Sequence, residues 1–454
     1  MASYSETSYY ERLASVLPER GFTANSENSR PRVLIVPNAA SWIVGQMAGH
    51  IMRRFSDRYE FWFMTDKMIR LRPDVVRALA PEIDFAFPLT DKGYHLIHKA
   101  IYPEKLPSLL WLHHVTNWTP AIREAVEASK ELIACTGEWK QEVANHARAD
   151  LPITVVPHGV DPDAFQRRPA QRSKYGMPTH AFVVGFVGSK TSNYDAGRKG
   201  LDTLERVLRQ IRDRIPNLHV SFLGLGWEKE VGKLRAEGIS ANYVGFVPES
   251  QLPDFYSSID TYLLTSRVEG GPCTVLESMA CETPVVATRV GLVPQTIRDG
   301  VNGFSTGIDD ADTLAAAIVQ LYSSPDVAKQ MGAAARATVT DSLSWNHTLS
   351  NLEGPLARME KLSMRRSRFS SDVSGEYARS LARAVHTADG TLWGVVSWWQ
   401  GLISPGTSLR LVKACCEGYG AADLLRGMGL VTRVAFRPSS LRKNLQAEVP
   451  AKAA

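Results

Sequence analysis

The chain has 454 residues, of which 44% are hydrophobic and 22% charged, and its formal net charge is +5. Because domains typically run to about 100–200 residues, this length predicts two globular units rather than one. The composition is typical of a globular protein, and it excludes the disordered, fibrous and low-complexity classes.

The positive charge is concentrated near the C-terminus. Between Arg365 and Ala454, 13 Lys and Arg stand against 6 Asp and Glu, a net charge of +7, which leaves −2 for the first 364 residues. We therefore expect no nucleic acid as a partner of the main body, whereas the tail is suited to contact an anionic membrane. The tail also contains an apolar run with Trp393, Trp398 and Trp399. The length of this run is well below the roughly 20 residues that span a bilayer. It is either an interfacial segment or part of an accessory subdomain.

The five cysteines are odd in number and include no CxxC pair, so the sequence indicates neither a disulfide framework nor a zinc site. The first thirty residues contain no apolar stretch of the kind that a signal peptide needs. Both features predict a cytoplasmic protein, peripheral at the inner face of the membrane if the tail binds there.

Residues 31–165 alternate short β-rich runs with helical stretches, which is the βαβ pattern of a parallel sheet. Thr119 followed by Pro120 predicts an N-cap and a first helical residue. Helices are expected at Ser41–Phe55 and Ala121–Lys130, and strands at Arg32–Val36, Glu60–Met64, Leu109–Leu112, Glu131–Cys135 and Ile153–Val156.

Turn-forming residues from Val156 to Phe165 and a polar stretch over 166–174 indicate a domain boundary. A second series of strands is expected at Ala181–Val187, Leu218–Leu223, Asn242–Gly245, Asp260–Leu264 and Pro284–Thr288. The expected fold class is α/β, with two doubly wound Rossmann-like domains in tandem and ligands at the carboxyl ends of the strands. The expected parts are a polar segment (1–30), an N-terminal domain (31–165), a C-terminal domain (175–342), a helix returning toward the first domain (343–364) and an extension (365–454).

The stretch from Glu269 to Glu277 places an acid, two glycines and a helix start directly after an apolar strand. Gly270 and Gly271 let the backbone approach a ligand closely, and the helix start offers unpaired N–H groups to a diphosphate. Glu277, about one turn into the helix, is suited to neutral hydroxyls such as those of ribose. Two other interpretations stay open at this point, because Thr274 to Glu277 also fits a capping box and Glu269 alone is typical of a solvated loop acid.

The sequence from Thr265 to Ala287 resembles the donor-site signature of glycosyltransferase family 4, and Asp299–Phe304 behind it does so too. The resemblance covers roughly residues 30–365, and its motifs occur in the family's order. It implies the GT-B architecture, in which two Rossmann-like domains face a central cleft, here with a C-terminal extension. The further motifs are Gly185–Gly188 with Arg198–Gly200, Val156–Asp161 and Leu343–Asn346.

The resemblance also implies roles for individual residues. Glu277 would hold the ribose, Glu269 would lie by the donor sugar, and Lys199 would neutralise the leaving diphosphate. Arg198 and Lys199 otherwise fit a solvated helix start. His113 resembles the active-site histidine of the family, with the adjacent His114 as the open alternative. The implied catalytic residues are His113, Lys199 and Glu269, and the implied donor-binding residues are Gly188, Lys190, Arg198, Lys199, Val247, Gly270, Gly271, Pro272, Cys273, Thr274 and Glu277.

Among the departures of the chain from the family pattern, two affect the expected ligand contacts. Gly188-Ser189-Lys190 stands where Gly-Arg is frequent, so the second phosphate-binding cation is either Lys190 or missing. In the loop after the first strand, only Gly45 matches a usual Gly-Gly pair.

The resemblance implies transfer of a sugar from a nucleoside diphosphate to an acceptor hydroxyl, with retention at the anomeric carbon. Neither a cofactor nor a metal is expected, and the partners are a nucleotide sugar and a hydroxyl acceptor, in the synthesis of a cell-surface polysaccharide or glycolipid. Two alternatives remain: a nucleotide-sugar 2-epimerase of the same fold, or a non-catalytic protein that binds a nucleotide sugar or a partner.

Overall fold

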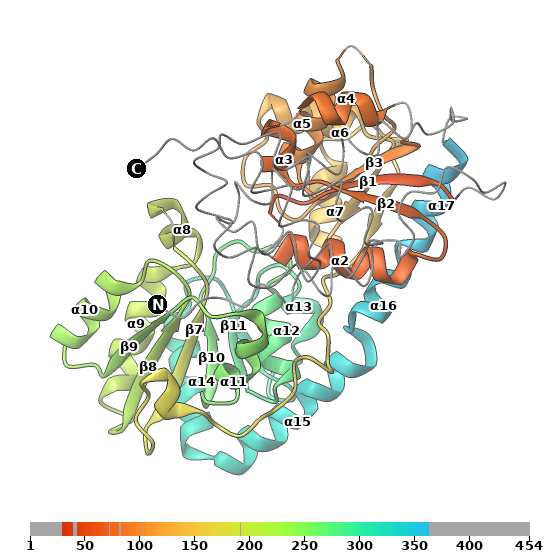
Figure 1. Cartoon of the computed structure of the whole chain (residues 1–454). Coiled ribbons are helices and arrows are strands. Elements are labelled where there is room, and N and C mark those ends of the chain that lie inside the picture. The colour runs from red at the N-terminus through yellow and green to blue at the C-terminus, as the bar shows by residue number, and fades with distance from the viewer. Residues whose placement is uncertain are drawn as a thin grey trace, which may run out of the picture. The chain divides into compact units, whose positions relative to one another are not determined.

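The computed structural model describes residues 30–39, 43–71, 73–80, 83–102, 104–190 and 192–362 (Figure 1). These residues fall into two compact units, of which the first ends at Pro107 and the second runs from Ser108 to Lys361. Among the described helices, none is both long and apolar enough to cross a membrane. The predicted polar segment before residue 30 and the predicted basic extension after residue 364 lie outside the described residues.

The first unit contains a parallel sheet of three strands in the order β2-β1-β3. Its central strand coincides with the predicted Arg32–Val36, and four of its five residues are fully buried, as a strand covered on both faces requires. The elements are β1 (Arg32–Val36), α2 (Ile43–Phe55), β2 (Glu60–Phe63), α3 (Asp66–Leu71), α4 (Pro73–Leu79), β3 (Phe85–Pro88) and α5 (Asp91–Ile101).

The second unit begins with a parallel sheet in the order β4-β5-β6. Thr119 caps the helix between the first two strands, since its Oγ1 accepts a hydrogen bond from the Ile122 N–H at 3.2 Å, and Pro120 is the first helical residue. The predicted start of this helix is therefore confirmed. The elements are β4 (Leu109–Leu112), α6 (Pro120–Ala128), β5 (Glu131–Ala134), α7 (Gly137–Ala144) and β6 (Ile153–Val155).

The same unit contains a six-stranded parallel sheet in the order β12-β11-β10-β7-β8-β9. The chain builds outward from β7 in one direction and from β10 in the other, so the strand order reverses between these neighbours. Ligands of doubly wound sheets bind at such a switch point. The elements are β7 (Phe182–Val187), α8 (Asn193–Arg198), α9 (Leu201–Arg212), β8 (Leu218–Leu223), α10 (Glu228–Ala236), β9 (Ala241–Gly245), α11 (Leu252–Tyr256), β10 (Thr261–Leu264), α12 (Cys273–Ala280), β11 (Val285–Thr288), α13 (Val293–Thr296), β12 (Phe304–Thr306), α14 (Ala311–Ser323) and α15 (Pro325–Ser342).

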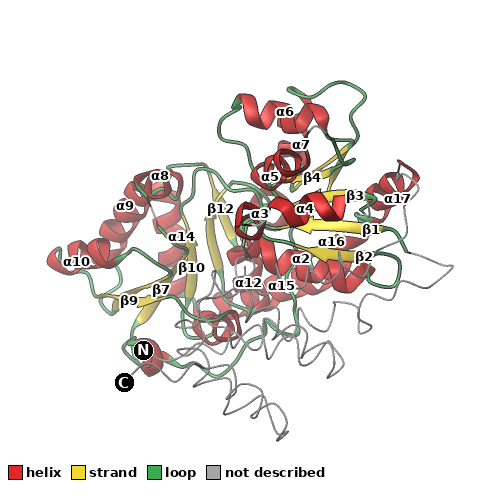
Figure 2. Cartoon of the chain, turned by 45° about the horizontal axis from the view of Figure 1, so that its top comes forward, coloured by secondary structure: helices red, strands yellow, loops and turns green. Residues whose placement is uncertain are grey.

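Alternate strand residues of the six-stranded sheet enter two separate cores, one on each face. Val184 and Phe186 pack with residues of α9, α10 and α14, whereas Val183 and Val187 pack with residues of α11, α12 and α15. Figure 2 shows α9, α10, α12, α14 and α15 around the strands of the sheet, and Figure 1 also labels α11. The result is the three-layer arrangement predicted for a doubly wound domain.

The last described helices, α16 (Trp345–Ser350) and α17 (Glu353–Leu362), lead back to the β4–β6 sheet. The guanidinium Nε of Arg358 lies 2.8 Å from Oε2 of Glu131 on β5, and the Val160 N–H donates to the Leu343 carbonyl at 3.0 Å. The sequence assigns β4–β6 to the first domain, whereas they belong to the same compact unit as the six-stranded sheet. The domain limits at residues 165 and 175 stay a prediction.

Candidate functional site

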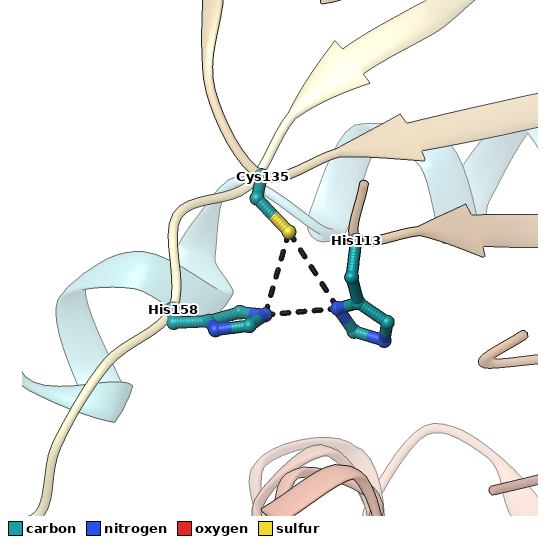
Figure 3. Close-up of side chains that lie close together, drawn as sticks. All are labelled: His113, Cys135 and His158. Carbon is teal, nitrogen blue, oxygen red and sulfur yellow. Dashed lines mark hydrogen bonds between the residues drawn. The ribbon is translucent and has the colours of Figure 1, made fainter. Parts of the chain in front are cut away.

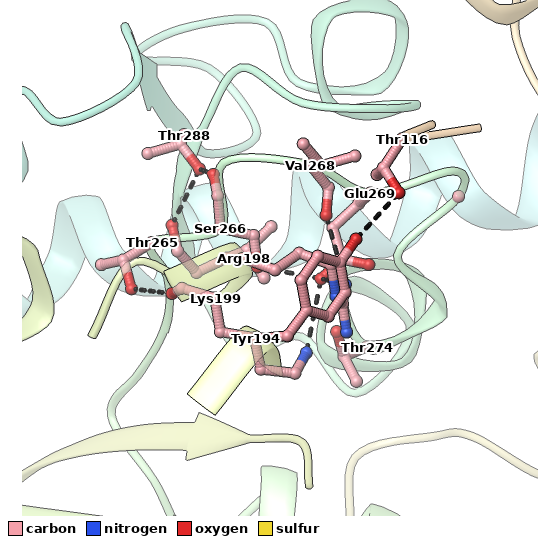
Figure 4. Close-up of polar contacts among 12 residues, drawn as sticks. Thr116, Tyr194, Arg198, Lys199, Thr265, Ser266, Val268, Glu269, Thr274 and Thr288 are labelled. Carbon is pink, nitrogen blue, oxygen red and sulfur yellow. Dashed lines mark hydrogen bonds and ion pairs between the residues drawn. The ribbon is translucent and has the colours of Figure 1, made fainter. Parts of the chain in front are cut away.

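Three donors surround the carboxylate of Glu269, five residues beyond β10 (Figure 4). Oε1 lies 3.0 Å from the Arg198 guanidinium, 3.3 Å from the Lys199 ammonium and 2.9 Å from the Ser266 hydroxyl. The three charged side chains are 11–15% exposed. One buried acid is thus held by two nearly buried cations, next to the switch point of the sheet.

Burial by itself would raise the pKa of Glu269, but the charges of Lys199 and Arg198 and the Ser266 hydrogen bond together lower it. Glu269 is therefore ionised at neutral pH, and the group carries a net positive charge of one. Such a group attracts an anion that offers more than one negative charge.

The C-terminal end of α8 carries both cations, and several hydrogen bonds fix it to the loop after β10. Thr265 Oγ1 donates to the Lys199 carbonyl at 2.8 Å, and the Arg198 guanidinium donates to the Val268 carbonyl at 3.2 Å. The alternative of a solvated helix start is wrong for Arg198 and Lys199, because they lie at a helix end, largely buried and paired with Glu269.

Glu277 is 7% exposed, on α12, and its Oε2 accepts a hydrogen bond from the Tyr256 hydroxyl at 2.8 Å. Burial raises its pKa to about 7. The capping-box alternative is wrong, because Pro272 is the N-cap of α12 and no side chain caps that helix. Thr274 instead accepts a hydrogen bond from the Tyr262 hydroxyl at 2.7 Å. Glu277 is a buried carboxyl group that a ligand with hydroxyl donors can stabilise in its charged form.

Three side chains meet at the carboxyl ends of the neighbouring strands β4, β5 and β6 (Figure 3). Nδ1 of His113 lies 3.0 Å from Nε2 of His158, and Sγ of Cys135 lies 3.6 Å and 3.4 Å from these two nitrogens. His158 and Cys135 are buried, and His113 is half-buried, whereas His114 is exposed. Of the two candidate histidines, His113 is the one that belongs to this cluster.

The hydrogen-bond partners assign the protons in this cluster. Nδ1 of His158 lies 2.7 Å from the Gly271 carbonyl oxygen, which only accepts, so this nitrogen carries a proton. Burial lowers the pKa of His158 to about 4, so the ring is neutral and its Nε2 has a lone pair. Nδ1 of His113 must donate to that lone pair, and in a neutral His113 this leaves Nε2 as an acceptor. Burial also raises the pKa of the Cys135 thiol to about 12, so the thiol stays protonated.

Protein groups occupy the space beside the two glycines of the motif. A Cβ on Gly270 would overlap the backbone carbonyl of His113, and one on Gly271 would lie 2.7 Å from Nδ1 of His158. The glycines therefore allow the loop before α12 to approach the histidine cluster closely. The Trp139 indole N–H adds a hydrogen bond of 3.0 Å to the Glu269 carbonyl.

The remaining predicted residues lie at varying places around the two sheets. Gly188 follows β7 with φ 151°, and Lys199 lies against it. Lys190 forms an ion pair with Glu230 on α10 rather than with Glu269.

Val247, after β9, is half-buried against one of the two cores. Pro272 and Cys273 open α12, and Sγ of Cys273 lies 3.4 Å from Nδ1 of His158.

Sequence reasoning missed Cys135, His158 and Tyr256. Cys135 is the last residue of one predicted strand and His158 follows another, so a signal was present in their positions at strand ends. It was not usable, because the order of the strands in the sheet was unknown. Tyr256 had no signal of its own, since it contacts Glu277 only through the packing of α11 against α12.

Comparison with known proteins agrees with the fold. Residues 167–338 match the family "Glycosyl transferases group 1". HepE of Anabaena, solved in complex with UDP and glucose, is similar with a TM-score of 0.62 and 18% identity over 72% of this chain and 100% of HepE. Sucrose-phosphate synthase of Thermosynechococcus elongatus is similar with a TM-score of 0.61 and 17% identity over 73% of this chain and 99% of the synthase. These neighbours have the GT-B fold, and the expected fold class is thus confirmed.

Two curated relatives are 31% identical to parts of this chain. One is the GDP-mannose-dependent alpha-(1-6)-phosphatidylinositol monomannoside mannosyltransferase of Mycolicibacterium smegmatis, over 42% of this chain and 52% of the relative. The other is the D-inositol 3-phosphate glycosyltransferase of Streptomyces scabiei, over 49% of this chain and 52% of the relative. The chain thus spans about half the length of these relatives. The predicted resemblance to glycosyltransferases is confirmed, since residues 167–338 match the glycosyl transferases group 1 family.

Proposed function

We propose that this protein is a retaining, family 4-like glycosyltransferase that moves a sugar from a nucleoside diphosphate to an acceptor hydroxyl. The observation that carries the proposal is the pairing of Glu269 with Lys199 and Arg198 at the switch point of the six-stranded sheet. A diphosphate that enters this group meets two fixed cations and, nearby, the N-terminus of α12. Negative charge that develops as the sugar departs would be stabilised there without a metal ion.

Glu269 is better suited to position the donor than to form a covalent bond. Its Oε1 already accepts from Ser266 and pairs with both cations, which lowers its pKa and its nucleophilicity. We infer that the leaving diphosphate takes the acceptor proton on the same face of the sugar, which gives retention. His113 would offer the lone pair of Nε2 to a hydroxyl of the donor or acceptor.

Glu277 is assigned to the ribose. A buried carboxyl group with a pKa of about 7 gains more from hydroxyl donors than an exposed one, because the buried charge has few other partners. Its second oxygen, Oε2, is held by Tyr256, and this contact orients the carboxyl plane.

The names of the relatives favour transfer over the elimination and re-addition of a 2-epimerase. The intact pairing of Glu269 with both cations argues against a non-catalytic protein. The relatives' printed substrates, an inositol phosphate and a phosphatidylinositol mannoside, support an acceptor in cell-surface glycolipid or polysaccharide synthesis.

We also propose that the basic tail beyond residue 364 holds the enzyme at an anionic membrane surface, where a lipid-linked acceptor would be found. The net charge of +7 and the run with Trp393, Trp398 and Trp399 support it. The intact protein should then bind anionic vesicles more tightly than a variant that ends at residue 364. Equal binding would contradict the proposal.

The test of the reaction is nucleotide release. The full chain in EDTA is supplied with UDP-, GDP- and ADP-sugars, with water or a candidate hydroxyl compound as acceptor, and the products are separated. With one of these nucleotide sugars, the enzyme should release the free nucleoside diphosphate and form a glycoside that keeps the anomeric configuration of the donor. Formation of an epimerised nucleotide sugar without an acceptor would establish the 2-epimerase instead. If no nucleotide sugar is consumed with any acceptor, the non-catalytic alternative holds.

A further inference from the structure

The cluster of His113, Cys135 and His158 brings three ligand atoms together. These atoms, Nδ1 of His113, Sγ of Cys135 and Nε2 of His158, all lie within 4.8 Å of one another (Figure 3). Each side chain follows a different strand of the β4-β5-β6 sheet, so the backbone holds all three from one rigid edge. The site was not predictable from the sequence, because the order of the strands was unknown and the sequence contains no CxxC pair.

The separations match those within the coordination shell of a zinc-like ion. With Zn–N bonds of about 2.0–2.1 Å and a Zn–S bond of about 2.3 Å, a tetrahedral shell places its ligand atoms roughly 3.3–3.8 Å apart. The two sulfur–nitrogen distances of 3.4 and 3.6 Å lie in that range. The nitrogen–nitrogen distance of 3.0 Å needs to open by only a few tenths of an ångström.

Outer hydrogen bonds already orient the ligands. Nδ1 of His158 donates to the Gly271 carbonyl at 2.7 Å, which directs the lone pair of Nε2 into the cluster. The Trp111 indole N–H donates to Sγ of Cys135 at 3.4 Å, a contact that would stabilise a thiolate. Metal-binding histidines generally donate their other ring N–H to a carbonyl or carboxylate in this way.

We propose that His113, Cys135 and His158 form a binding site for a transition-metal ion of the Zn²⁺ type. Two imidazoles and a thiolate select Zn²⁺ or Co²⁺ over Mg²⁺, which prefers oxygen ligands. On binding, the Cys135 thiol releases its proton to solvent and the His113 proton moves from Nδ1 to Nε2. The four-coordinate shell is completed by water.

An ion bound at this site would inhibit the enzyme, an inference that rests on the proposed function. His113 exchanges an acceptor at Nε2 for a donor when the ion binds, and its ring becomes fixed to the metal. Nε2 then no longer accepts a hydrogen bond, or the proton, from a substrate hydroxyl. The ion is therefore an inhibitor of the proposed reaction.

The binding test uses Co²⁺ as the probe on the untagged full chain with Cys415 and Cys416 replaced by Ser, because those thiols lie outside the described residues. We expect about one Co²⁺ per chain with a near-ultraviolet thiolate-to-cobalt absorption band, displaced by Zn²⁺. Cys135→Ser should abolish the band, and His158→Asn should weaken Co²⁺ binding at least tenfold. Cys281→Ser, a change at another buried cysteine outside the cluster, is the matched control and should keep both the absorption band and the Co²⁺ affinity.

The proposal is overturned if the parent protein shows no thiolate band, or if the band survives in Cys135→Ser. The absorption spectrum of the parent protein tests the proposal even if a variant does not fold. Nucleotide release is measured separately: Zn²⁺ should suppress it, a chelator should restore it, and Cys135→Ser should raise the inhibitory Zn²⁺ concentration at least tenfold. A band with unchanged nucleotide release would leave the metal site standing and remove only its inhibitory role.

Discussion

Nδ1 of His113 lies 3.0 Å from Nε2 of His158, so one imidazole sets the proton position of the other. His158 itself is fixed through its hydrogen bond to the carbonyl of Gly271 in the donor-site motif. The side chain that the resemblance assigns to the active site is thereby tied to the loop that is proposed to bind the sugar. The hydrogen bond from His158 to Gly271 therefore sets both the His113 tautomer and the direction of the His158 Nε2 lone pair.

His158→Ala should lower kcat/KM roughly fivefold to tenfold, because one hydrogen bond of about 1 kcal/mol that orients His113 is lost. Nucleotide release in the presence of EDTA measures the change. His158→Asn should restore part of the activity, since an amide oxygen can accept from the His113 N–H, whereas a purely structural role would give no such rescue. His180→Ala, at an exposed histidine, is the control.

Lys199→Ala should reduce kcat about a hundredfold, because a fixed cation is removed from the place where negative charge develops. Lys229→Ala, at an exposed lysine on α10, should have no effect on the rate. Unchanged nucleotide release in Lys199→Ala would refute the assignment of Lys199 to the leaving group.

Glu269→Gln should destabilise the fold by about 3 kcal/mol at neutral pH, because two largely buried cations lose their counter-charge. The folded pKa of Glu269 is lowered, so its stabilisation is fully present above the unfolded value of about 4.5 and disappears as the pH falls through the folded pKa. Urea unfolding of both proteins at neutral and acidic pH checks this. A difference that stays constant across that range would contradict the ion-pair assignment.

Glu277 should have the opposite effect on stability. Its folded pKa of about 7 exceeds the ordinary glutamate value of 4.5, so the folded state binds more protons between these values and stability falls as the pH rises through them. The loss is about 3 kcal/mol. Glu277→Gln should be more stable than the parent protein at about pH 8, while Glu228→Gln, at an exposed glutamate on α10, should show no such gain.

The same carboxyl group should couple nucleotide binding to proton release. Ribose hydroxyls favour the ionised form of Glu277, so the affinity for the matching nucleotide should rise roughly tenfold from about pH 6 to about pH 8. Calorimetry in buffers of different ionisation enthalpy would detect the released proton. Persistence of this pH dependence in Glu277→Gln would assign it to another group.

Arg358→Ala should destabilise the second unit by about 2 kcal/mol, since it leaves the Glu131 carboxylate, which is 1% exposed, without its main partner. The expected loss is smaller than for a fully buried pair because Arg358 is 48% exposed. Arg209→Ala removes two ion pairs, with Glu205 and Glu237, from an exposed arginine and should leave the unfolding midpoint nearly unchanged. Equal midpoints for both variants would show that α17 does not depend on this contact.

The sequence alone determined most of the elements and the identity of the central motif. Strands such as Arg32–Val36, Leu109–Leu112 and Leu218–Leu223 were predicted to the residue, because a buried parallel strand is a short apolar run bounded by turn formers. The position of Glu269, two glycines and Glu277 across a strand end and a helix start is likewise a local pattern. It needs no knowledge of how the strands are ordered.

Tertiary structure decided everything that depends on contacts between distant segments. Only the order β4-β5-β6 brings His113, Cys135 and His158 together, and only the packing of α11 against α12 gives Glu277 a tyrosine partner instead of a helix cap. Contacts between distant segments likewise show that Lys199 is paired rather than solvated. Its partner lies 70 residues further along the chain, and the end of α8 is fixed to the loop after β10. Burial and pKa follow from these neighbours, and local sequence periodicity carries no information about them.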